Sequence, residues 1–339
     1  MSVQLIPVAA DEADVRLDRW FRRRWPAVSQ GRLEKLLRTG QVRVDGRRAK
    51  AGQRLEAGQV VRIPPLPADP EDHADAMPAR SAAPAIRPDD EAMILESILY
   101  HDDDVIVLNK PPGLAVQGGT NTKVHVDALL DVLRFDSRER PRLVHRLDKD
   151  TSGILVLARS ARSASALAAA FRSRAARKIY WALVVGYPNP SRGSIRAPVA
   201  KVPVAGVEKM EVNVEEGQAA RTEFAVLDKA GRCVTWLHLE PLTGRTHQLR
   251  VHCAYLGTPI LGDGKYGGAE AHIQGEGISR KLHLHARALR IPHPSGRGEL
   301  TIQAPLPKHM ASSFEAFGFD EKEVSDPFAV LPETTRKKK

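Results

Sequence analysis

The sequence has few cysteines, no long apolar run and no recognisable leader. Cys233 and Cys253 are the only cysteines among 339 residues. They form no CxxC pair, which excludes a four-cysteine zinc site and argues against a disulfide scaffold. No run of about 18 apolar residues occurs, which excludes a membrane-spanning helix. The N-terminus lacks the basic and then apolar pattern of a secretory signal. We therefore expect a cytoplasmic protein with no membrane partner.

Two further absences limit the chemistry that the chain can perform. The pattern GxxxxGK[ST] does not occur, so no nucleotide-triphosphate loop is indicated. Four histidines invite a metal interpretation: His247, His252, His283 and His285. His283 and His285 would share one strand face, but there is no HExxH motif and the cysteines are badly placed. We expect neither a metal nor a cofactor.

Basic residues are in excess, with 51 Lys and Arg against 41 Asp and Glu and a net charge of +10. This excess favours a polyanionic partner, with solvated surface charge as the alternative. The charge is uneven, because residues 1–63 hold 14 basic and 7 acidic residues whereas residues 64–104 hold 2 and 11. An acidic segment between two basic ones predicts a domain boundary.

The boundary is a proline-rich stretch. Residues 64–88 contain seven prolines and no aromatic residue. Such a segment cannot bury enough apolar surface to offset the entropy lost on ordering, so residues 64–91 are predicted to be a flexible linker. We expect one domain over residues 1–63, a second over 92–317, and a charged, disordered tail over 318–339.

The first unit is predicted to contain two helices followed by short strands. Leu17, Trp20 and Phe21 lie at helical spacing, and leucines at 33, 36 and 37 repeat the pattern. Ser29 and Gly40 are the expected N-cap and C′ residues of the second helix. This α+β module resembles the S4 RNA-binding domain over the stretches RLDRWFRRRW, SQGRLEKLLRTGQVRVDG and LEAGQVVRI. Basic residues on the second helix and the next strand are candidate phosphate contacts: Arg32, Lys35, Arg38 and Arg43.

The second unit reads as a mixed, largely antiparallel sheet with packed helices. Predicted strands are VIVLN, GILVLA, KIYWALVVG, ARTEFAVLD, RCVTWLHLE and LHLHARALRI, and predicted helices lie in SARSASALAAAFRSRAA and RTHQLRVHCAYLG. Arg245 and Arg250 lie five apart, so on a helix they would point in different directions.

The segment HRLDKDTSG, residues 145–153, places a carboxylate, two cations and two hydroxyls in one loop between two apolar strands. Asp and Ser in a loop are commonly turn or capping residues, which is the alternative to a chemical role. Asp148 beside Arg146 would remain ionised and oriented, as a nucleophile or a transition-state stabiliser requires. On an extended strand these two side chains would face the same side.

This segment closely resembles the HRLD signature of the RluA-type pseudouridine synthases. VLNKPPGLAVQGG, KIYWALVVG, LTGRTHQLRVH and LHLHA resemble further motifs of that family, in the family's order. With the S4-like unit in front, the chain most resembles the C-type synthases of large-subunit ribosomal RNA. The resemblance implies an α+β pseudouridine synthase fold and isomerisation of uridine to pseudouridine in RNA, with ribosomal RNA as the partner.

The resemblance also implies residue roles. Asp148 would be the catalytic carboxylate, paired with Arg250, and Tyr180 would contact the flipped base and help to remove the C5 proton. Arg146 would contact RNA or support the flipped geometry, and Leu284, or Leu282, would pack on the base. From its spacing to Arg250, rather than from the resemblance, we expect Arg245 to contact a phosphate.

Two other functions stay open on the sequence. A non-catalytic RNA-binding or ribosome-assembly factor could reuse the fold, and a synthase could act on transfer RNA. We expect the chain to act as a monomer.

Overall fold

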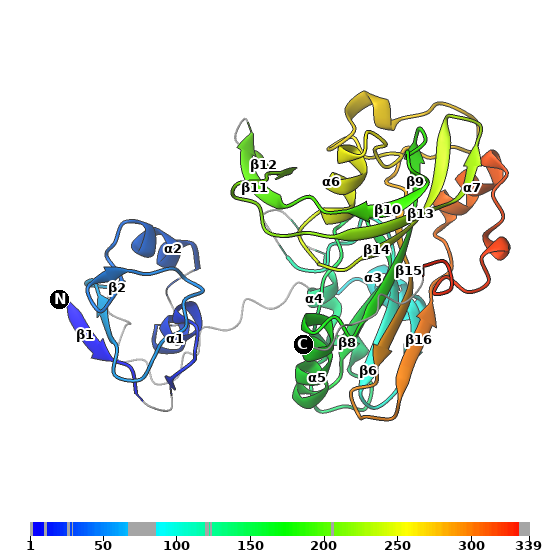
Figure 1. Ribbon diagram of the computed structural model, residues 1–339. Coiled ribbons are helices and arrows are strands. Elements are labelled where there is room, and N and C mark those ends of the chain that lie inside the picture. The colour runs from blue at the N-terminus through cyan, green and yellow to red at the C-terminus, as the bar shows by residue number, and fades with distance from the viewer. Residues whose placement is uncertain are drawn as a thin grey trace. The chain divides into compact units, whose positions relative to one another are not determined.

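The computed structural model describes residues 3–9, 12–25, 28, 30–66, 86–118, 122, 124–204 and 207–331. The chain divides into two compact units, Met1–Ala82 and Ala83–Lys339. Figure 1 shows each unit with its own helices and strands. Each unit is described separately below.

The N-terminal unit packs two helices on a four-stranded sheet. The helices are α1 (Leu17–Arg24) and α2 (Gln30–Arg38). The sheet has the order β1-β4-β2-β3, with bounds β1 (Gln4–Pro7), β2 (Arg43–Val44), β3 (Arg47–Arg48) and β4 (Val60–Ile63). The predicted leucines and aromatics of both helices form the core. Gly40 follows α2 with φ +70°, a conformation that glycine adopts without the steric cost of a side chain, as predicted for C′. The expected N-cap Ser29 lies outside the described residues.

The ends of the predicted linker are ordered. Leu66 is buried in the core of the N-terminal unit. At the other end, α3 (Pro88–Glu96) begins inside the expected 64–91 segment, with Pro88 at the start of the helix, where its missing N–H costs nothing. Ile94 of α3 is fully buried in the second unit. The prediction was therefore wrong for these end residues, and residues 67–85 lie outside the described part of the chain.

The second unit is built on one mixed sheet, as predicted. Its strand order is β10-β13-β14-β9-β15-β8-β6-β5, with β16 added beside β15 and β7 beside β8. The β15–β8 pair is parallel, and the other pairs are antiparallel. The bounds are β5 (Ile98–His101), β6 (Val105–Lys110), β7 (Arg142–Leu143), β8 (Ser152–Ala158), β9 (Arg177–Val185), β10 (Arg192–Ile195), β13 (Thr222–Ala230), β14 (Val234–Pro241), β15 (Leu284–Pro292) and β16 (Glu299–Gln303).

Helices and connections cover both faces of this sheet. The helices are α4 (Val126–Leu129), α5 (Ala161–Arg172), α6 (Gln248–Tyr255) and α7 (Lys308–Phe317), and the 3₁₀ turns are η2 (Val132–Arg134), η3 (Gly268–Ala271) and η4 (Glu321–Glu323). Alternate residues of β9 enter two cores: Ala182 and Val184 pack with α6 residues, and Trp181 packs with Phe314 of α7. Burial on both faces explains why β9 and β14 read as nearly continuous apolar runs.

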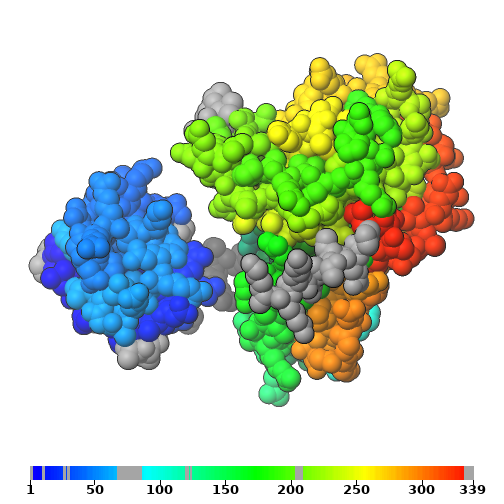
Figure 2. All heavy atoms as spheres, viewed as in Figure 1, coloured from blue at the N-terminus to red at the C-terminus, as the bar shows by residue number. Residues whose placement is uncertain are grey.

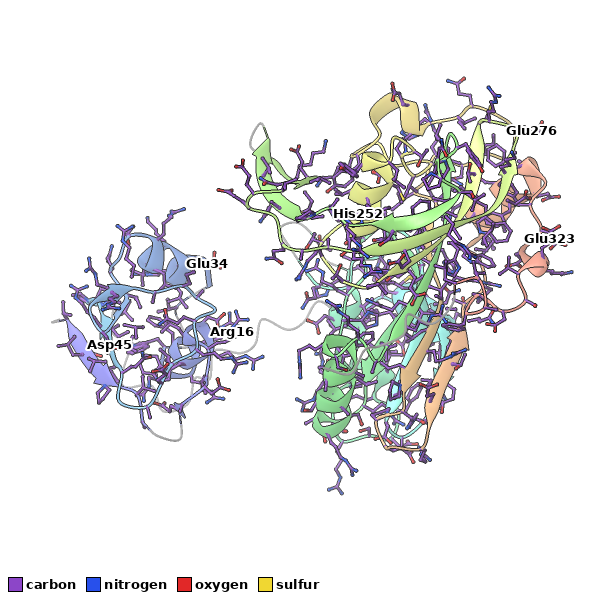
Figure 3. All side chains as sticks on the ribbon, in the orientation of Figure 1. Arg16, Glu34, Asp45, His252, Glu276 and Glu323 are labelled. Atoms are coloured by element: carbon purple, nitrogen blue, oxygen red, sulfur yellow. The ribbon has the colours of Figure 1, made fainter. Side chains whose placement is uncertain are left out.

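Helix α6 is shorter than its sequence pattern predicted. It begins at Gln248, so Arg245 lies in the preceding loop and the helical spacing between Arg245 and Arg250 was wrong. The Gln248 side chain accepts from Thr243 Oγ1 at 2.7 Å and from the Arg245 backbone N–H at 3.1 Å. These bonds hold residues 243–247 as a loop. Figure 3 shows His252 on the same helix, where it bonds to Thr222 of β13 and to the Ala197 carbonyl.

Two features were not predicted. The hairpin β11 (Val199–Val204) and β12 (Val207–Val212) forms its own two-stranded sheet.

The prediction of a disordered tail is wrong for residues 318–331, which pack against the domain. Phe328 and Leu331 are buried, and the Arg177 guanidinium donates to both of their carbonyls, at 2.8 and 2.6 Å. Figure 2 shows red atoms of this segment beside green atoms of the same unit. Residues 332–339 lie outside the described range. In the described residues, no helix is long and apolar enough to span a membrane.

Candidate active site

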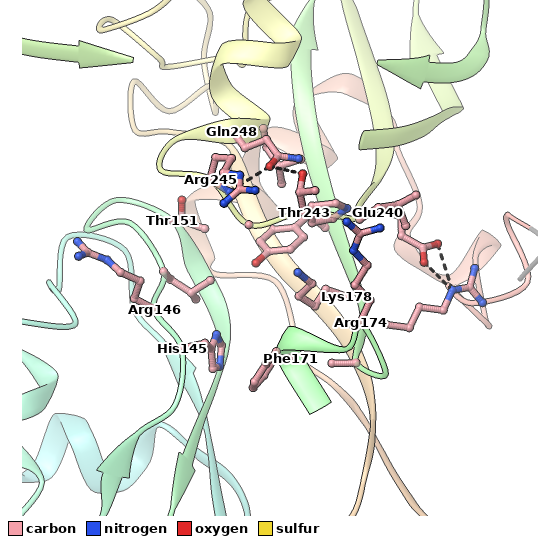
Figure 4. A pocket seen from close by; sticks show the side chains of 18 of the residues that line it. His145, Arg146, Thr151, Phe171, Arg174, Lys178, Glu240, Thr243, Arg245 and Gln248 are labelled. Atoms are coloured by element: carbon pink, nitrogen blue, oxygen red, sulfur yellow. Dashed lines mark hydrogen bonds and ion pairs between the residues drawn. The ribbon is translucent and has the colours of Figure 1, made fainter. Parts of the chain in front are cut away.

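A cleft of about 1120 Å³ opens in the second unit, where the ends of several strands meet. Its walls come from the loop between β7 and β8, from the start of β9, from the loop after β14 and from the starts of α6 and β15 (Figure 4). Nine of the lining residues are Arg or Lys, against three Asp or Glu. A concave surface with this charge favours a polyanion.

The loop that carries Asp148 is held from beneath by a buried lysine. Lys110 is fully buried at the end of β6, and its Nζ donates to the carbonyls of Pro111, Leu114 and Lys149 at 2.8, 2.9 and 2.9 Å. Burial lowers the pKa of Lys110 to about 7, while Asp150 and Asp148 oppose this shift. Lys110 donates all three of its ammonium protons. It therefore links the VLNKPPG segment, in which it lies, to the HRLDKD segment about 40 residues later in the sequence.

The start of β8, directly after this loop, approaches β15 very closely. Gly153 has φ +104°, and a Cβ atom there would lie 2.3 Å from the Ala286 carbonyl oxygen. Only glycine permits both this backbone conformation and this approach. The resulting parallel β8–β15 pair brings Asp148 and Leu284 to the same cleft.

Asp148 is half-buried, with 21% of its side chain exposed. Residues 144–151 form a loop rather than a strand, so the expected shared strand face with Arg146 does not exist. The imidazole of His247 lies close by, with its Nε2 3.8 Å from Asp148 Oδ1. Arg146 is exposed, and Figure 4 shows its guanidinium turned away from Gln248 across the cleft.

Tyr180 projects from β9 into the cleft. Burial raises the pKa of the Tyr180 phenol well above its ordinary value, and the Asp148 carboxylate raises it further. The phenol is therefore neutral at physiological pH and offers a ring face and a hydroxyl to a ligand.

Arg250 lines the cleft, but its hydrogen-bonded carboxylate is Asp263 rather than Asp148. Arg250 Nε and Nη2 donate to Asp263 Oδ2 and Oδ1 at 2.8 and 2.7 Å. The expected direct pairing with Asp148 was wrong because Asp263, fully buried after Gly262, takes the guanidinium in a two-point contact. Asp148 acts on Arg250 electrostatically and is one of the charges that raise the pKa of Arg250, against the burial that lowers it.

The remaining predicted cleft residues are also brought together. Leu284 lines the cleft at the first position of β15, with 2% exposure, and Leu282 packs in the core beside α6. Arg245 is exposed at the rim, where its Nε donates to the Ala219 carbonyl at 3.2 Å. Arg32, Lys35, Arg38 and Arg43 are all exposed on the N-terminal unit, which is a separate body.

The four histidines bond to protein groups rather than to one another. His283 bonds to the Leu261 carbonyl and Ser313 Oγ, and His285 bonds to Ser152 Oγ and the Ala304 carbonyl. His252 bonds as described above. Within the described ranges, no three His, Cys, Asp or Glu side chains gather as a metal site requires.

Several cleft residues were missed on the sequence. Arg174, Arg177, Lys178, Arg221 and Arg290 come from different strands and turns, so no local pattern marks them as one surface. His247 was considered only as a metal ligand, and Lys110 only as the end of a strand. The sequence feature that could have identified His247 as a cleft residue is its position in RTHQLR, two residues after Arg245.

Comparison with known proteins fits this geometry. Residues 104–255 match the RNA pseudouridylate synthase family, and residues 15–61 match the S4 domain. Ribosomal large subunit pseudouridine synthase C of Vibrio cholerae is 36% identical over 310 residues, which cover 91% of this chain and 95% of that protein. RNA pseudouridine synthase 4, mitochondrial, of Arabidopsis thaliana is 34% identical over 90% of this chain and 80% of its own length.

A solved structure has the same fold. Human RNA Pseudouridylate Synthase Domain Containing 4 matches with a TM-score of 0.58 and 30% identity, covering 68% of this chain and 96% of that one. The chain therefore belongs to the RNA pseudouridylate synthase family and is an RNA-modifying enzyme with an N-terminal S4 domain.

Proposed function

We propose that this protein isomerises uridines of large-subunit ribosomal RNA, with Asp148 as the reacting carboxylate. The observation that carries the proposal is that Asp148, Tyr180, Arg250 and Leu284, from four separate elements, line one basic cleft. The names of the relatives from Vibrio cholerae and other bacteria support ribosomal RNA as the substrate.

The reaction needs a base that is turned out of its helix. Extrusion costs a few kcal/mol, which contacts to the flipped nucleotide must offset. Leu284 supplies an apolar surface and Tyr180 an aromatic face. The cations at the rim, Arg146 and Arg245 among them, bind the phosphates on either side. The S4 unit adds phosphate contacts through Arg32, Lys35, Arg38 and Arg43.

Isomerisation breaks the N1–C1′ bond and forms a C5–C1′ bond, while a proton leaves C5 and N1 gains one. Asp148 forms a bond to the nucleoside as the N1–C1′ bond breaks, and that bond is broken again when C5 attaches to C1′. The neutral Tyr180 hydroxyl accepts the C5 proton on its oxygen and passes its own proton on to N1, so the tyrosine is unchanged at the end. No electron or phosphoryl group is transferred, so we propose that the reaction requires no cofactor. We also infer that one chain suffices, since every residue assigned to the reaction comes from it.

The test compares wild type with Asp148→Asn, which keeps the size of the side chain and removes its charge. We expect no detectable pseudouridine from the variant on a large-subunit RNA hairpin, with RNA affinity within about tenfold of wild type. Pseudouridine mapping in a deletion strain and its parent then identifies the RNA. Lost sites confined to transfer RNA would overturn the ribosomal assignment, and near-normal Asp148→Asn activity would overturn the role of Asp148.

A further inference from the structure

His247 faces Asp148 across the cleft, and its backbone conformation is unusual for a residue other than glycine. Its Nε2 lies 3.8 Å from Asp148 Oδ1, and its φ of +53° is in the left-handed region, at the position just before α6. A residue other than glycine in this region carries strain that its surroundings must hold in place. The Gln248 side chain holds the loop before His247, and Tyr266 holds the imidazole itself.

The contact with Tyr266 assigns the protons of the imidazole. The Met210 backbone N–H donates to Tyr266 Oη at 3.3 Å, so the hydroxyl proton is directed to the other neighbour of that oxygen, His247 Nδ1, at 2.6 Å. With Nδ1 as the acceptor, the neutral ring carries its proton on Nε2, the nitrogen that faces Asp148. Burial lowers the pKa of His247, which favours this neutral form, although Asp148 opposes the shift.

Tyr266 is itself rigidly placed. Its backbone N–H donates to Asp263 Oδ1 at 3.2 Å, and the Arg250 guanidinium lies 4.9 Å from its ring centroid. Because Asp263 also takes Arg250 in a two-point contact, one carboxylate orders both the arginine and the tyrosine. A chain of contacts therefore runs from Asp263 through Tyr266 and His247 to the Asp148 carboxylate.

We propose that His247 is a positioning residue for Asp148. Its Nε2–H, oriented by Tyr266, attracts one carboxylate oxygen and leaves the other for the sugar of the flipped uridine. The 3.8 Å separation shortens to a hydrogen bond when RNA closes the cleft. This inference rests on the proposed role of Asp148 and adds a residue that acts through it.

The test removes the ring without straining the backbone. Glycine adopts φ +53° freely, so His247→Gly deletes the side chain while keeping the loop conformation accessible. His247→Gln restores an N–H donor at nearly the reach of Nε2, and Tyr266→Phe removes the hydroxyl that orients the ring. Single-turnover rates at saturating enzyme are measured on a hairpin substrate, together with RNA affinity and thermal melting.

We expect His247→Gly to lower the single-turnover rate about a hundredfold, because a reacting group displaced by about 1 Å loses that much. RNA affinity should stay within about threefold. His247→Gln should recover to within about tenfold of wild type. Tyr266→Phe should cost about tenfold alone and nothing further in the His247→Gly background, since both act on one carboxylate. Exposed His101→Gln and Tyr255→Phe are the matched controls and should match wild type.

A His247→Gly rate within about threefold of wild type would overturn the proposal, as would a His247→Gln variant no faster than His247→Gly. Independent, multiplying losses from the two substitutions would overturn it too. Asp148→Asn is assayed beside them. If that variant is active, the proposed function fails, whereas if it is inactive and His247→Gly is fast, only the positioning role fails.

Discussion

Individual side chains in and beneath this cleft are held in place by burial and by hydrogen bonds to polar partners. Lys110 donates to three carbonyls, Arg250 donates to one carboxylate, and Tyr180 is partly buried where it lines the cleft. Buried polar groups without partners are costly, so each of these contacts stabilises the fold while it sets the geometry of the site. Residue identity at these positions therefore affects stability and chemistry together.

The phenol of Tyr180 leads to a prediction at this scale. Tyr180→Phe keeps the ring for stacking and loses the hydroxyl, so we expect the single-turnover rate to fall about a hundredfold or more with RNA affinity within about threefold. Because burial raises the pKa of Tyr180, the wild-type rate should show no rise from phenolate formation between about pH 8 and pH 10. The exposed Tyr187→Phe is the control. An increase in the wild-type rate near pH 9 that Tyr180→Phe abolishes would contradict this view.

At the scale of elements, the parallel contact between β8 and β15 brings the loop that carries Asp148 beside Leu284. Ser152 pairs with His285 and Gly153 with Ala286, directly beside the Asp148 loop and Leu284. On their other sides the same residues pair with neighbouring strands, Ala286 with Tyr180 of β9 and Gly153 with Lys110 of β6. A small change in this spacing should move the Asp148 carboxylate relative to Leu284.

Gly153→Ala tests this contact. The added Cβ would lie 2.3 Å from a backbone oxygen, at φ +104°, so we expect a loss of about 3 kcal/mol or more of unfolding free energy, and loss of activity. Gly231→Ala is the matched control, since Gly231 has φ +59° but nothing within 4 Å of the new Cβ. It should lose only about 1 kcal/mol by urea denaturation, with activity unchanged. Equal losses in the two variants would show that backbone strain alone, and not the β8–β15 contact, matters.

At the scale of the whole molecule, we expect RNA binding to be divided between two units. On the proposed function, the cleft binds the flipped nucleotide and its neighbours, while the exposed cations of α2 and β2 belong to a unit with its own core. Phosphate contacts made by separate units contribute to affinity through counterion release, so each should appear in the salt dependence of binding.

Removal of Met1–Ala82 should leave a folded synthase unit, because α3 and its buried Ile94 remain. We expect weaker RNA binding and a smaller slope of log affinity against log salt, by about 0.7–0.9 for each phosphate that the truncated protein no longer neutralises. Replacing Arg32, Lys35 and Arg38 together by Gln removes charge but keeps the S4 fold, and should give part of the same change. An unchanged slope in both variants would show that the S4 unit does not bind the substrate RNA.

Local sequence patterns predicted many of the helices, strands and loops of this protein. The helical spacing of Leu17, Trp20 and Phe21, the apolar runs of the sheet and the HRLD loop all depend on neighbours within a few residues, so they could be read from the chain. Family resemblance then indicated that Asp148, Tyr180, Arg250 and Leu284 would meet, and the structure brings them to one cleft.

Which polar side chains pair with one another depends on the tertiary structure and could not be predicted from the sequence. Arg250 bonds to Asp263 because a buried turn 13 residues away presents a two-point partner, and His247 faces Asp148 because Tyr266 and Gln248 fix its ring and its loop. Residues 318–331 are ordered because Arg177 offers donors to their carbonyls, which a charged composition does not reveal. Such contacts join side chains that are distant in the chain, and their energies depend on burial, which the fold alone sets.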